Sequence, residues 1–202
     1  KPETGWNFEF GSRGLIFHKK LQYSASIFRL NVNNLLVARG TSEDEFIGIN
    51  AGKTQHDGLE FNLNYNWIKS ETLFINTFIN GTLNNFTFKE FIDDGNDFSG
   101  NDLTGVPNSV LNFGVDFTST MGFYGNLNFQ NVGMMPITDS NNLYSDSYSL
   151  TNFKFGYQKN LNEKLKLNLF FGLNNIFNTK YASQILINAT GFGGSIPRYF
   201  YP

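Results

Sequence analysis

The sequence predicts an all-β fold, a transmembrane antiparallel β-barrel to which this chain contributes about eight strands. Three observations predict it: apolar residues recur at every second position, the alternating segments are long, and their connections alternate between short and long. Residues 164–181 show the period of two most clearly. Their odd positions include Leu165, Leu167, Leu169, Phe171, Leu173 and Phe177, and polar or small residues fill most positions between them.

The composition fits a barrel of this kind. Of the 202 residues, 40% are hydrophobic and 17% aromatic, with 23 Phe and no Cys. Half of each barrel strand faces lipid, so an ordinary average can hide an apolar surface. A net charge of -2 argues against nucleic-acid binding, which needs a basic surface. The lack of Cys excludes disulfides and thiolate metal sites, and no apolar run is long enough for a transmembrane helix.

Eight alternating segments can be marked, each bounded by clusters of Gly, Asn, Asp, Ser or Pro. Four connections are short and four are long, which is the pattern of a bacterial outer-membrane barrel with turns on one rim and loops on the other. The segments are 6–17, 21–39, 57–69, 72–91, 107–119, 122–135, 146–159 and 164–181; the short connections are 18–20, 70–71, 120–121 and 160–163; the long ones are 40–56, 92–106, 136–145 and 182–197.

The parity of the residue numbers predicts which side chains face lipid. In all eight strands we expect odd-numbered apolar residues such as Leu63, Phe113 and Leu169 to point outward and even-numbered residues inward. Arg13 and Arg29 are exceptions that require either a bulge or a position at the membrane interface. Cross-strand partners should have numbers that sum to an even value. Gln158 should therefore pair with Lys166 or with a residue two positions away.

A β-sandwich or β-solenoid also has alternating strands. Strand length argues against both, because globular strands average about 5–6 residues and residues 72–91 remain strand-like for much longer. A membrane strand needs about 9–11 residues for the hydrocarbon alone. Aromatic residues near the segment ends are expected in interface girdles. They are Trp6, Trp67, Tyr157, Phe177 and Tyr181.

Four stretches resemble successive landmarks in the C-terminal half of TonB-dependent outer-membrane receptors. They are KPETGWNFEFGSRG at 1–14, GVPNSVLNFGVDF at 105–117, GLNNIFNTKYAS at 172–183 and IPRYFYP at 196–202. The resemblance implies that residues 1–202 are the C-terminal portion of a 22-stranded barrel in the bacterial outer membrane, without the plug domain and with the last strand cut off. An open sheet leaves unpaired edges in lipid, which cost several kcal/mol per backbone group. We therefore expect a longer polypeptide.

The resemblance also implies uptake of a scarce ligand, most often a ferric siderophore, with energy from TonB, and no enzymatic activity. The implied partners are outer-membrane lipid, the N-terminal plug, TonB and the ligand; no cofactor, metal or nucleic acid is expected. Cations and rings near the long loops are candidates to bind an anionic ferric complex: Arg39, Lys53, His56, Tyr144, Phe192, Arg198 and Tyr199. Expected to face the lumen and plug are Glu60, Asp116, Lys154, Lys164 and Lys166, the lysines as one basic patch near the short-turn rim.

Other interpretations remain open at this point. The chain could be a small stand-alone barrel with a structural or adhesive role, or a soluble β binding module. His56 lies beside Asp57, with Ser42 and Thr54 nearby, so a hydrolase constellation is conceivable. The loop 92–106 carries oxygen ligands of the kind that Ca²⁺ prefers, without EF-hand spacing. These ligands are Asp93, Asp94, Asn96, Asp97, Asn101 and Asp102.

Overall fold

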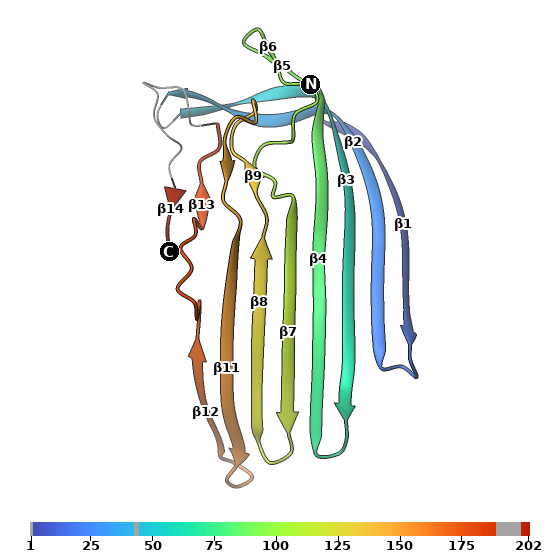
Figure 1. Ribbon diagram of the computed structural model, residues 1–202, viewed down its shortest axis with the longest axis vertical. Helices are drawn as coiled ribbons and strands as arrows, with labels where there is room; N and C mark the ends of the chain where they lie inside the picture. The colour runs from blue at the N-terminus through green and yellow to red at the C-terminus, as the bar shows by residue number, and fades with distance from the viewer. Residues whose placement is uncertain (1, 43–44, 189–198) are drawn as a thin grey trace.

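The computed structural model describes residues 2–42, 45–188 and 199–202. They form one antiparallel sheet with short turns at one end and long loops at the other (Figure 1). Within these ranges no helix is long and apolar enough to cross a membrane. The sheet has eight strands in the order of the chain: β1 Thr4–Ile16, β2 Leu21–Ser42, β3 Glu45–Lys69, β4 Leu73–Glu90, β7 Ser109–Ser119, β8 Phe123–Val132, β11 Tyr148–Asn160 and β12 Lys166–Leu173.

Three pairs of two-residue strands decorate the long-loop end. They are β5 Ile92–Asp93 with β6 Asn96–Asp97, β9 Met135–Pro136 with β10 Tyr144–Ser145, and β13 Gln184–Ile185 with β14 Tyr199–Phe200. The predicted all-β antiparallel architecture is therefore confirmed, and the barrel is not closed by these strands alone.

Two predicted boundaries are wrong. The stretch 40–56 is not a loop, because β2 and β3 continue through it as a long hairpin. The last predicted strand, 164–181, ends at Leu173. Asn175 and Asn178 adopt positive φ there, and the Asn175 side chain bonds to the backbone of Thr179, so the chain turns instead of continuing the ladder.

The register confirms the parity prediction from β2 to β12. Partner numbers sum to an even value in each of these pairings apart from bulged ends; for example, Leu63 pairs with Ile79 and Phe113 with Phe129. Gln158 pairs with Asn168, two positions beyond Lys166. Beside the short β3–β4 turn a bulge at Trp67 restores this parity. Odd apolar side chains of these strands therefore share one face.

The prediction is wrong for β1, where the two faces are exchanged. Ile16 pairs with Leu21, which leaves an even number of residues, 17–20, in the turn and makes the partner numbers sum to an odd value. Trp6 and Phe10 consequently lie on the apolar face, with exposed fractions of 73% and 76%. Arg13 lies on the polar face and needs neither a bulge nor a membrane interface.

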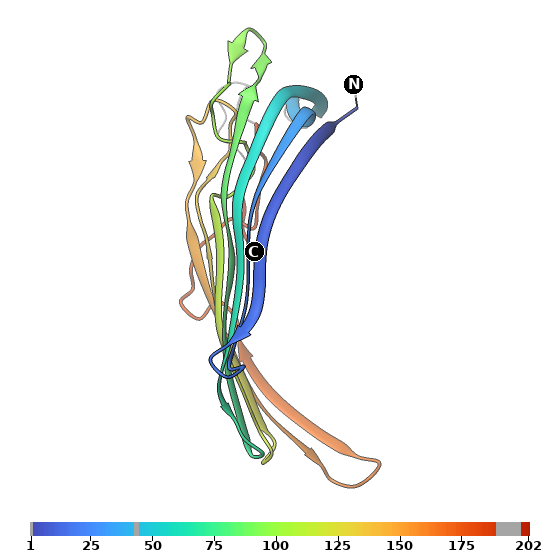
Figure 2. The same ribbon diagram turned by 90° about the vertical axis from the view of Figure 1, so that its right-hand side faces the viewer.

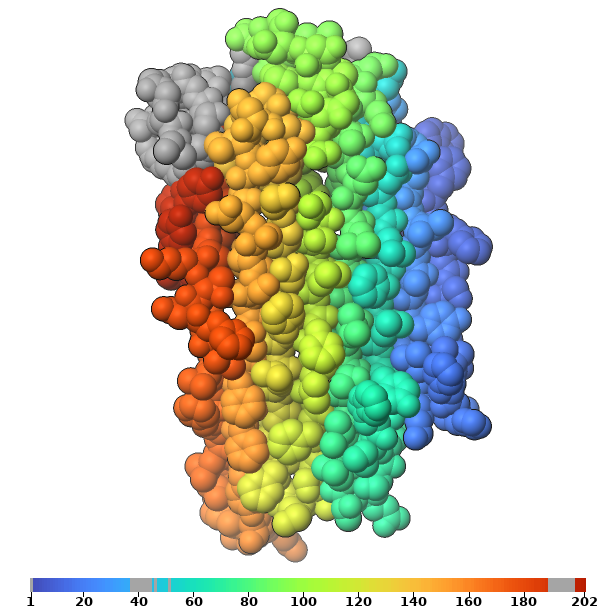
Figure 3. Space-filling model, in the orientation of Figure 1, coloured from blue at the N-terminus to red at the C-terminus, as the bar shows by residue number. Residues whose placement is uncertain are grey.

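The sheet is curved (Figure 2). Figure 3 is viewed from its convex side. By register, the convex face carries the odd apolar residues of β2 to β12. The concave face carries the polar residues. On the convex face the apolar row Ile27–Leu59–Leu83 is followed toward the long loops by the polar row Arg29–Asp57–Asn85. Arg29 and Asp57 form a bidentate ion pair there, with contacts of 2.7 and 2.8 Å.

Three aromatic side chains of the concave face lie directly over glycines of the neighbouring strand: Phe28 over Gly58, Phe78 over Gly114 and Tyr124 over Gly156. In each case a Cβ on the glycine would collide with the ring. The three pairs lie at different heights between the long loops and the short turns. Glycine at these positions therefore lets each ring lie against the neighbouring backbone.

The upper part of the β2–β3 hairpin bends across the concave side of the sheet (Figures 1 and 2). The bend occurs where Asn34 and Gly52 face each other between the pairs Asn33–Lys53 and Leu35–Ala51. Asn34 has a φ of 60°, and a Cβ at Gly52 would overlap the carbonyl oxygen of Glu90. These two residues therefore form the hinge of the hairpin.

A small apolar core lies beneath this hairpin. Phe88, Phe91 and Leu103 are buried, with exposed fractions of 0%, 1% and 7%. Leu35 and Ile49 of the bent hairpin pack against them. The convex apolar residues have no such cover, since Leu169 for example is 59% exposed.

Candidate functional site

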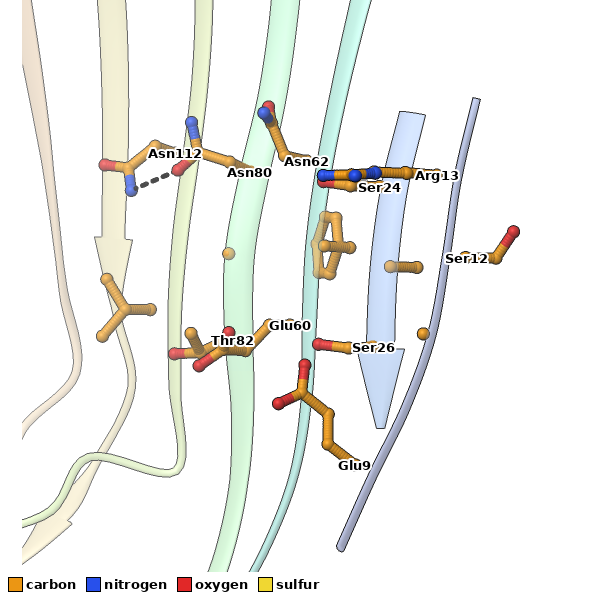
Figure 4. Close-up of a pocket in the computed structure, with 15 residues that line it drawn as sticks. Glu9, Ser12, Arg13, Ser24, Ser26, Glu60, Asn62, Asn80, Thr82 and Asn112 are labelled. Atoms are coloured by element: carbon orange, nitrogen blue, oxygen red, sulfur yellow. Dashed lines mark hydrogen bonds between the residues drawn. The ribbon is translucent and has the colours of Figure 1, made fainter. Parts of the chain in front are cut away.

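A polar hollow of about 650 Å³ lies on the concave face (Figure 4). Its wall crosses β1, β2, β3, β4 and β7, and Figure 4 shows Ser12 pointing away from it, as the exchanged faces of β1 require. Asn112 donates a hydrogen bond of 3.1 Å to Asn80 within it. The charged and polar lining includes Glu9, Arg13, Ser24, Ser26, Glu60, Asn62, Asn80, Thr82 and Asn112.

Amide side chains continue this polar wall toward the short turns. Asn126 donates to the Asp116 carboxylate at 2.6 Å, and the Tyr124 hydroxyl donates to Asn168 at 2.8 Å. An amide both donates and accepts, so it can bond to water or to any polar polypeptide surface without a charge match. The wall therefore offers hydrogen bonds of both kinds to whatever fills the concave side.

The structure does not bring the three candidate lysines together. Lys154 pairs with Gly172, whereas Lys166 pairs with Asn160 at the other end of the β11–β12 ladder. Gly172 and Lys166 are six positions apart in β12, or roughly 20 Å at about 3.3 Å per residue. Lys154 instead holds its Nζ 4.6 Å from the ring centroid of Phe170. The expected single basic patch of Lys154, Lys164 and Lys166 is therefore not formed.

Two candidate ligand-binding residues of β3 lie on opposite faces. His56 faces the concave side, stacked on Phe86 with ring centroids 4.6 Å apart and 3.0 Å from the Thr54 hydroxyl. Lys53 faces the convex side, where its Nζ lies 2.6 Å from Glu90. Of the other candidates, Phe192 and Arg198 lie outside the described residues, and at Arg39 only the backbone of β2 is described.

The conceivable hydrolase constellation is not assembled. The Asp57 carboxylate lies on the convex face in its ion pair with Arg29, away from His56. Ser42 pairs with Glu45 at the far end of the hairpin, 11 positions from His56 along β3. Among the described residues His56 has the Thr54 hydroxyl beside it, but neither Asp57 nor Ser42 lies close enough to complete a triad with it.

A second hollow, of about 830 Å³, lies near the long loops and is lined by four tyrosines. Tyr148 and Tyr181 stack with centroids 4.8 Å apart, and Tyr199 and Tyr201 line the same hollow, which we call the tyrosine pocket. Tyr148 pairs with Val132, and both even-numbered residues belong to the concave face. The pocket combines ring faces with hydroxyl groups, which suits an organic ligand that carries both apolar and polar groups.

Of the two tyrosines predicted to bind a ligand, Tyr144 and Tyr199, only one lines this pocket. Tyr199 does, whereas the hydroxyl of Tyr144 lies 3.3 Å from the Asp102 carboxylate in a separate hollow of about 330 Å³. Sequence reasoning placed Tyr181 in an interface girdle and did not single out Tyr148. The available signal was that Tyr148 is even-numbered and begins a strand next to a long loop.

The acidic loop between β4 and β7 uses its oxygen atoms within the protein. The Asp97 carboxylate accepts from the backbone of Ser99 at 2.9 Å, and hydrogen bonds from the Ser99 side chain and then its backbone lower the Asp97 pKa. The Asn101 side chain donates to the carbonyl of Asp139 at 2.7 Å. Burial raises the pKa of Asp139, partly opposed by hydrogen bonds from Thr104 and Asn188. Across the described ranges no three His, Asp or Glu residues are grouped as metal ligands.

Comparison with known proteins places these features in context. A family model described as "TonB dependent receptor-like, beta-barrel" matches residues 1–176. The ferric citrate transporter FecA in its unliganded form has a similar structure, with a TM-score of 0.75 and 19% identity over 100% of this chain and 30% of FecA. The ferric yersiniabactin uptake receptor FyuA from Yersinia pestis gives 0.70 and 18%, over 99% of this chain and 28% of FyuA.

The siderophore receptor PiuA from Acinetobacter baumannii is also similar, with a TM-score of 0.66 and 16% identity over 98% of this chain and 26% of PiuA. At these identities the likeness concerns the fold. The chain spans less than a third of the length of each of these three receptors.

Proposed function

The chain belongs to the TonB-dependent receptor-like β-barrel family, and on that basis we propose that it is part of a bacterial outer-membrane receptor for active transport. In this proposal the receptor binds a scarce ligand, a ferric siderophore or similar metal complex, at its long-loop end and imports it with energy from TonB. Residues 1–202 form the C-terminal portion of the barrel, and an N-terminal plug and further strands complete it.

The division of the sheet into two faces carries this proposal. Residues such as Phe113, Phe129 and Leu169 give the convex face an apolar surface that suits lipid, and the concave face is rich in amides and carboxylates. Neither β1 nor β12 has a partner on its outer edge among the described strands. Because unpaired backbone groups are costly in lipid, further strands beside both edges suit this surface.

The tyrosine pocket is the proposed ligand contact within this chain. Its size is within the range of small-molecule sites, roughly 300–1,000 Å³. Tyr148, Tyr181 and Tyr199 present rings and hydroxyls at the long-loop end. FyuA is an uptake receptor and FecA a transporter for a ferric complex, and another similar structure, with a TM-score of 0.64 and 16% identity, is a copper transporter, OprC. These three proteins support a metal complex as the class of cargo.

We propose that the polar concave wall contacts the plug. The charged groups of that wall include Glu60 in the hollow, Asp116 beside Asn126, and Lys154 over Phe170. Individual contacts at a hydrated wall are worth about 0–1 kcal/mol each. Such contacts would position a plug and still let it move when TonB pulls.

The test is uptake by the full-length receptor in bacteria, with ferric citrate, a ferric catecholate and cupric ions as separate probes. We expect uptake of at least one probe that stops when TonB is removed, while binding to the cell surface continues. Recovery of the protein in the soluble fraction, or uptake equal with and without TonB, would contradict the proposal. A stand-alone structural or adhesive barrel would give neither binding nor uptake.

A substitution at the pocket tests its part in binding. Tyr148→Ala should weaken binding of the transported probe by about 10-fold, since an aromatic ring in a ligand site contributes on the order of 1 kcal/mol or more. Tyr157→Ala is the matched control, because Tyr157 is also in β11 but lies on the convex face near the short turns. Equal loss of binding in both variants would show that the pocket has no special role.

A further inference from the structure

We propose that the connection between β4 and β7, residues 91–108, couples the bent β2–β3 hairpin to the β9–β10 loop, residues 137–143. We call residues 91–108 the coupling loop. In this arrangement the hairpin holds its position over the concave side only while the coupling loop is bound to the β9–β10 loop. The contacts stand without any assumption about cargo, and only their use, to report occupancy of the long-loop end, rests on the proposed function.

One side of the coupling loop forms the seat of the hairpin. Phe91 and Leu103 belong to this loop and are buried together with Phe88, whose ring centroid lies 4.8 Å from that of Phe91. Leu35 and Ile49 of the hairpin pack on this cluster, just beyond the hinge at Asn34 and Gly52. No other buried apolar cluster joins the hairpin to the rest of the described chain. Phe91 and Leu103 are therefore the apolar support of the hairpin, beside the 2.6 Å bond from the Leu36 amide to the Glu3 carboxylate.

Backbone hydrogen bonds join the coupling loop to the end of β4. The Leu103 amide donates to the Phe86 carbonyl at 2.8 Å, and the Phe88 amide donates to the Asn101 carbonyl at 2.9 Å. The Gly100 amide donates to the Phe88 carbonyl at 2.8 Å. The coupling loop is therefore held to β4 by backbone hydrogen bonds, so it can transmit a displacement.

The other side of the coupling loop is bound to the β9–β10 loop. The Thr104 hydroxyl donates to one carboxylate oxygen of Asp139, and the Asn101 side chain donates to the Asp139 carbonyl at 2.7 Å. Asp102 and Asn141 exchange two bonds, from the Asp102 amide at 2.6 Å and from the Asn141 side chain at 3.0 Å. Thr104 and Asp102 flank Leu103, so three consecutive residues contact both the β9–β10 loop and the hairpin. We call the hydrogen bonds to the β9–β10 loop the latch, and the apolar contact of Phe91 and Leu103 with the hairpin the seat.

Asp139 extends the same network to the segment that follows β13. The Asn188 side chain donates to the second Asp139 carboxylate oxygen at 3.0 Å, and the Asp139 amide donates to the Asn188 side chain at 3.1 Å. The Asn188 amide donates to the carbonyl of Ile137, a fully buried residue. Gln184 and Ile185 of β13 line the tyrosine pocket. A continuous set of contacts therefore runs from this pocket through Asp139 to the hairpin.

Contiguity alone does not establish energetic coupling, so the test measures coupling directly. The full-length receptor, without added ligand, carries one nitroxide label on a cysteine introduced at Ile47, an exposed hairpin residue in a chain that has no cysteine. Electron paramagnetic resonance then gives the mobile fraction of the hairpin label. Leu103→Ser removes the seat, and Asp139→Ala removes the latch without touching the hairpin.

We expect each substitution to raise the mobile fraction by about twofold or more, the size of effect that contiguous networks carry. The double variant should be no more mobile than Leu103→Ser alone, because both changes release the same element. Asp139→Asn keeps the shape of the side chain and should give a smaller rise. Asp97→Ala is the matched control, since it removes a carboxylate of the same loop that bonds only to Ser99 among the described residues.

Two results would overturn the inference. One is a hairpin that stays immobile in both Asp139 variants, which would show that the seat acts alone. The other is a strictly additive double variant, which would show two independent contacts. Heat-modifiable migration on gels confirms that each variant still forms a barrel. Because no ligand is used, loss of TonB-dependent uptake in the separate assay has no bearing on this outcome.

Discussion

The short-turn half and the long-loop half of the sheet are stabilised in different ways. Toward the short turns the strands form a regular ladder, with apolar residues such as Leu169 exposed on the convex face and amides on the concave face. In the described chain, the buried apolar side chains Phe88, Phe91, Leu103 and Ile137 all lie at the long-loop end. The short-turn half is therefore held by backbone pairing, whereas the long-loop half has a small buried core of its own.

The comparison has a thermodynamic consequence. In lipid the ladder cannot open without exposing unpaired backbone groups, so it should open only with the whole barrel. Under the proposed function the long-loop end lies in water, and because a few packed rings and hydrogen bonds hold it, it should open locally. Substitutions at the two ends should therefore differ in the region whose stability they lower and in the size of that loss.

The largest expected effect is at the buried core. Phe88→Ala should cost about 3–5 kcal/mol of local stability, the usual range for a buried phenylalanine, because Phe88 is fully buried against Phe91. Hydrogen exchange should accelerate in the hairpin and the coupling loop and remain unchanged in β8 and β11 near the short turns. Equal acceleration at both ends would break the distinction between the two halves.

A charge on the lipid face should have the next largest effect. Phe129→Lys should lower the free energy of unfolding by about 2–4 kcal/mol, the range for a cation at mid-bilayer depth. Its neighbour Asn128 faces the concave side, so Asn128→Lys should change the same quantity much less. The measurement is urea unfolding in lipid vesicles. Similar losses for the two variants would mean that the faces are wrongly assigned.

The aromatic–glycine pairs should give an intermediate effect. Gly114→Val forces the Phe78 ring off the neighbouring strand and should cost about 1–3 kcal/mol, as overpacking usually does. Gly172→Val is the control, because a Cβ there meets only the Phe153 carbonyl oxygen, at 3.7 Å. If both variants unfold at the same urea concentration, ring contact with the glycine backbone contributes nothing measurable.

The smallest effect should come from the ion pair between Lys53 and Glu90. Both side chains are more than half exposed, at 53% and 63%, so Lys53→Gln should change stability by about 0–1 kcal/mol. Any change should shrink further as salt is added. A loss well above this range, insensitive to salt, would mean that the pair is held away from water.

The ladder could be predicted from the sequence because it follows a single rule. Alternation of apolar and polar residues sets the faces, and short turns set the neighbours, which is why the Gln158–Asn168 pairing was within the predicted choice. The rule failed at β1 because parity across a hairpin depends on the turn length, and one residue more or fewer at 17–20 exchanges the faces. The alternation within β1 carried the signal, because Trp6, Phe8 and Phe10 are even-numbered whereas Glu9 and Arg13 are odd-numbered.

The candidate site was less predictable, because its residues depend on contacts between loops distant in the sequence. His56 and Lys53 have suitable chemistry for a ligand, yet strand alternation sends them to opposite faces. Asp139 has no apolar pattern or motif around it, and its partners Thr104 and Asn188 are 35 and 49 positions away. The hairpin at 40–56 was missed because its few apolar residues do not alternate regularly with polar ones, Phe46 and Ile47 being adjacent.

The rings that lie over Gly58, Gly114 and Gly156 also shape the surface of the concave wall. A phenylalanine or tyrosine that stood upright there would narrow the space in front of the sheet, whereas Phe28, Phe78 and Tyr124 occupy room that the missing side chains leave free. They present flat faces at three heights, and carbon surfaces offer a moving body few hydrogen bonds to break. If cargo or a displaced plug passes along this wall, these three rings narrow its path less than upright rings would.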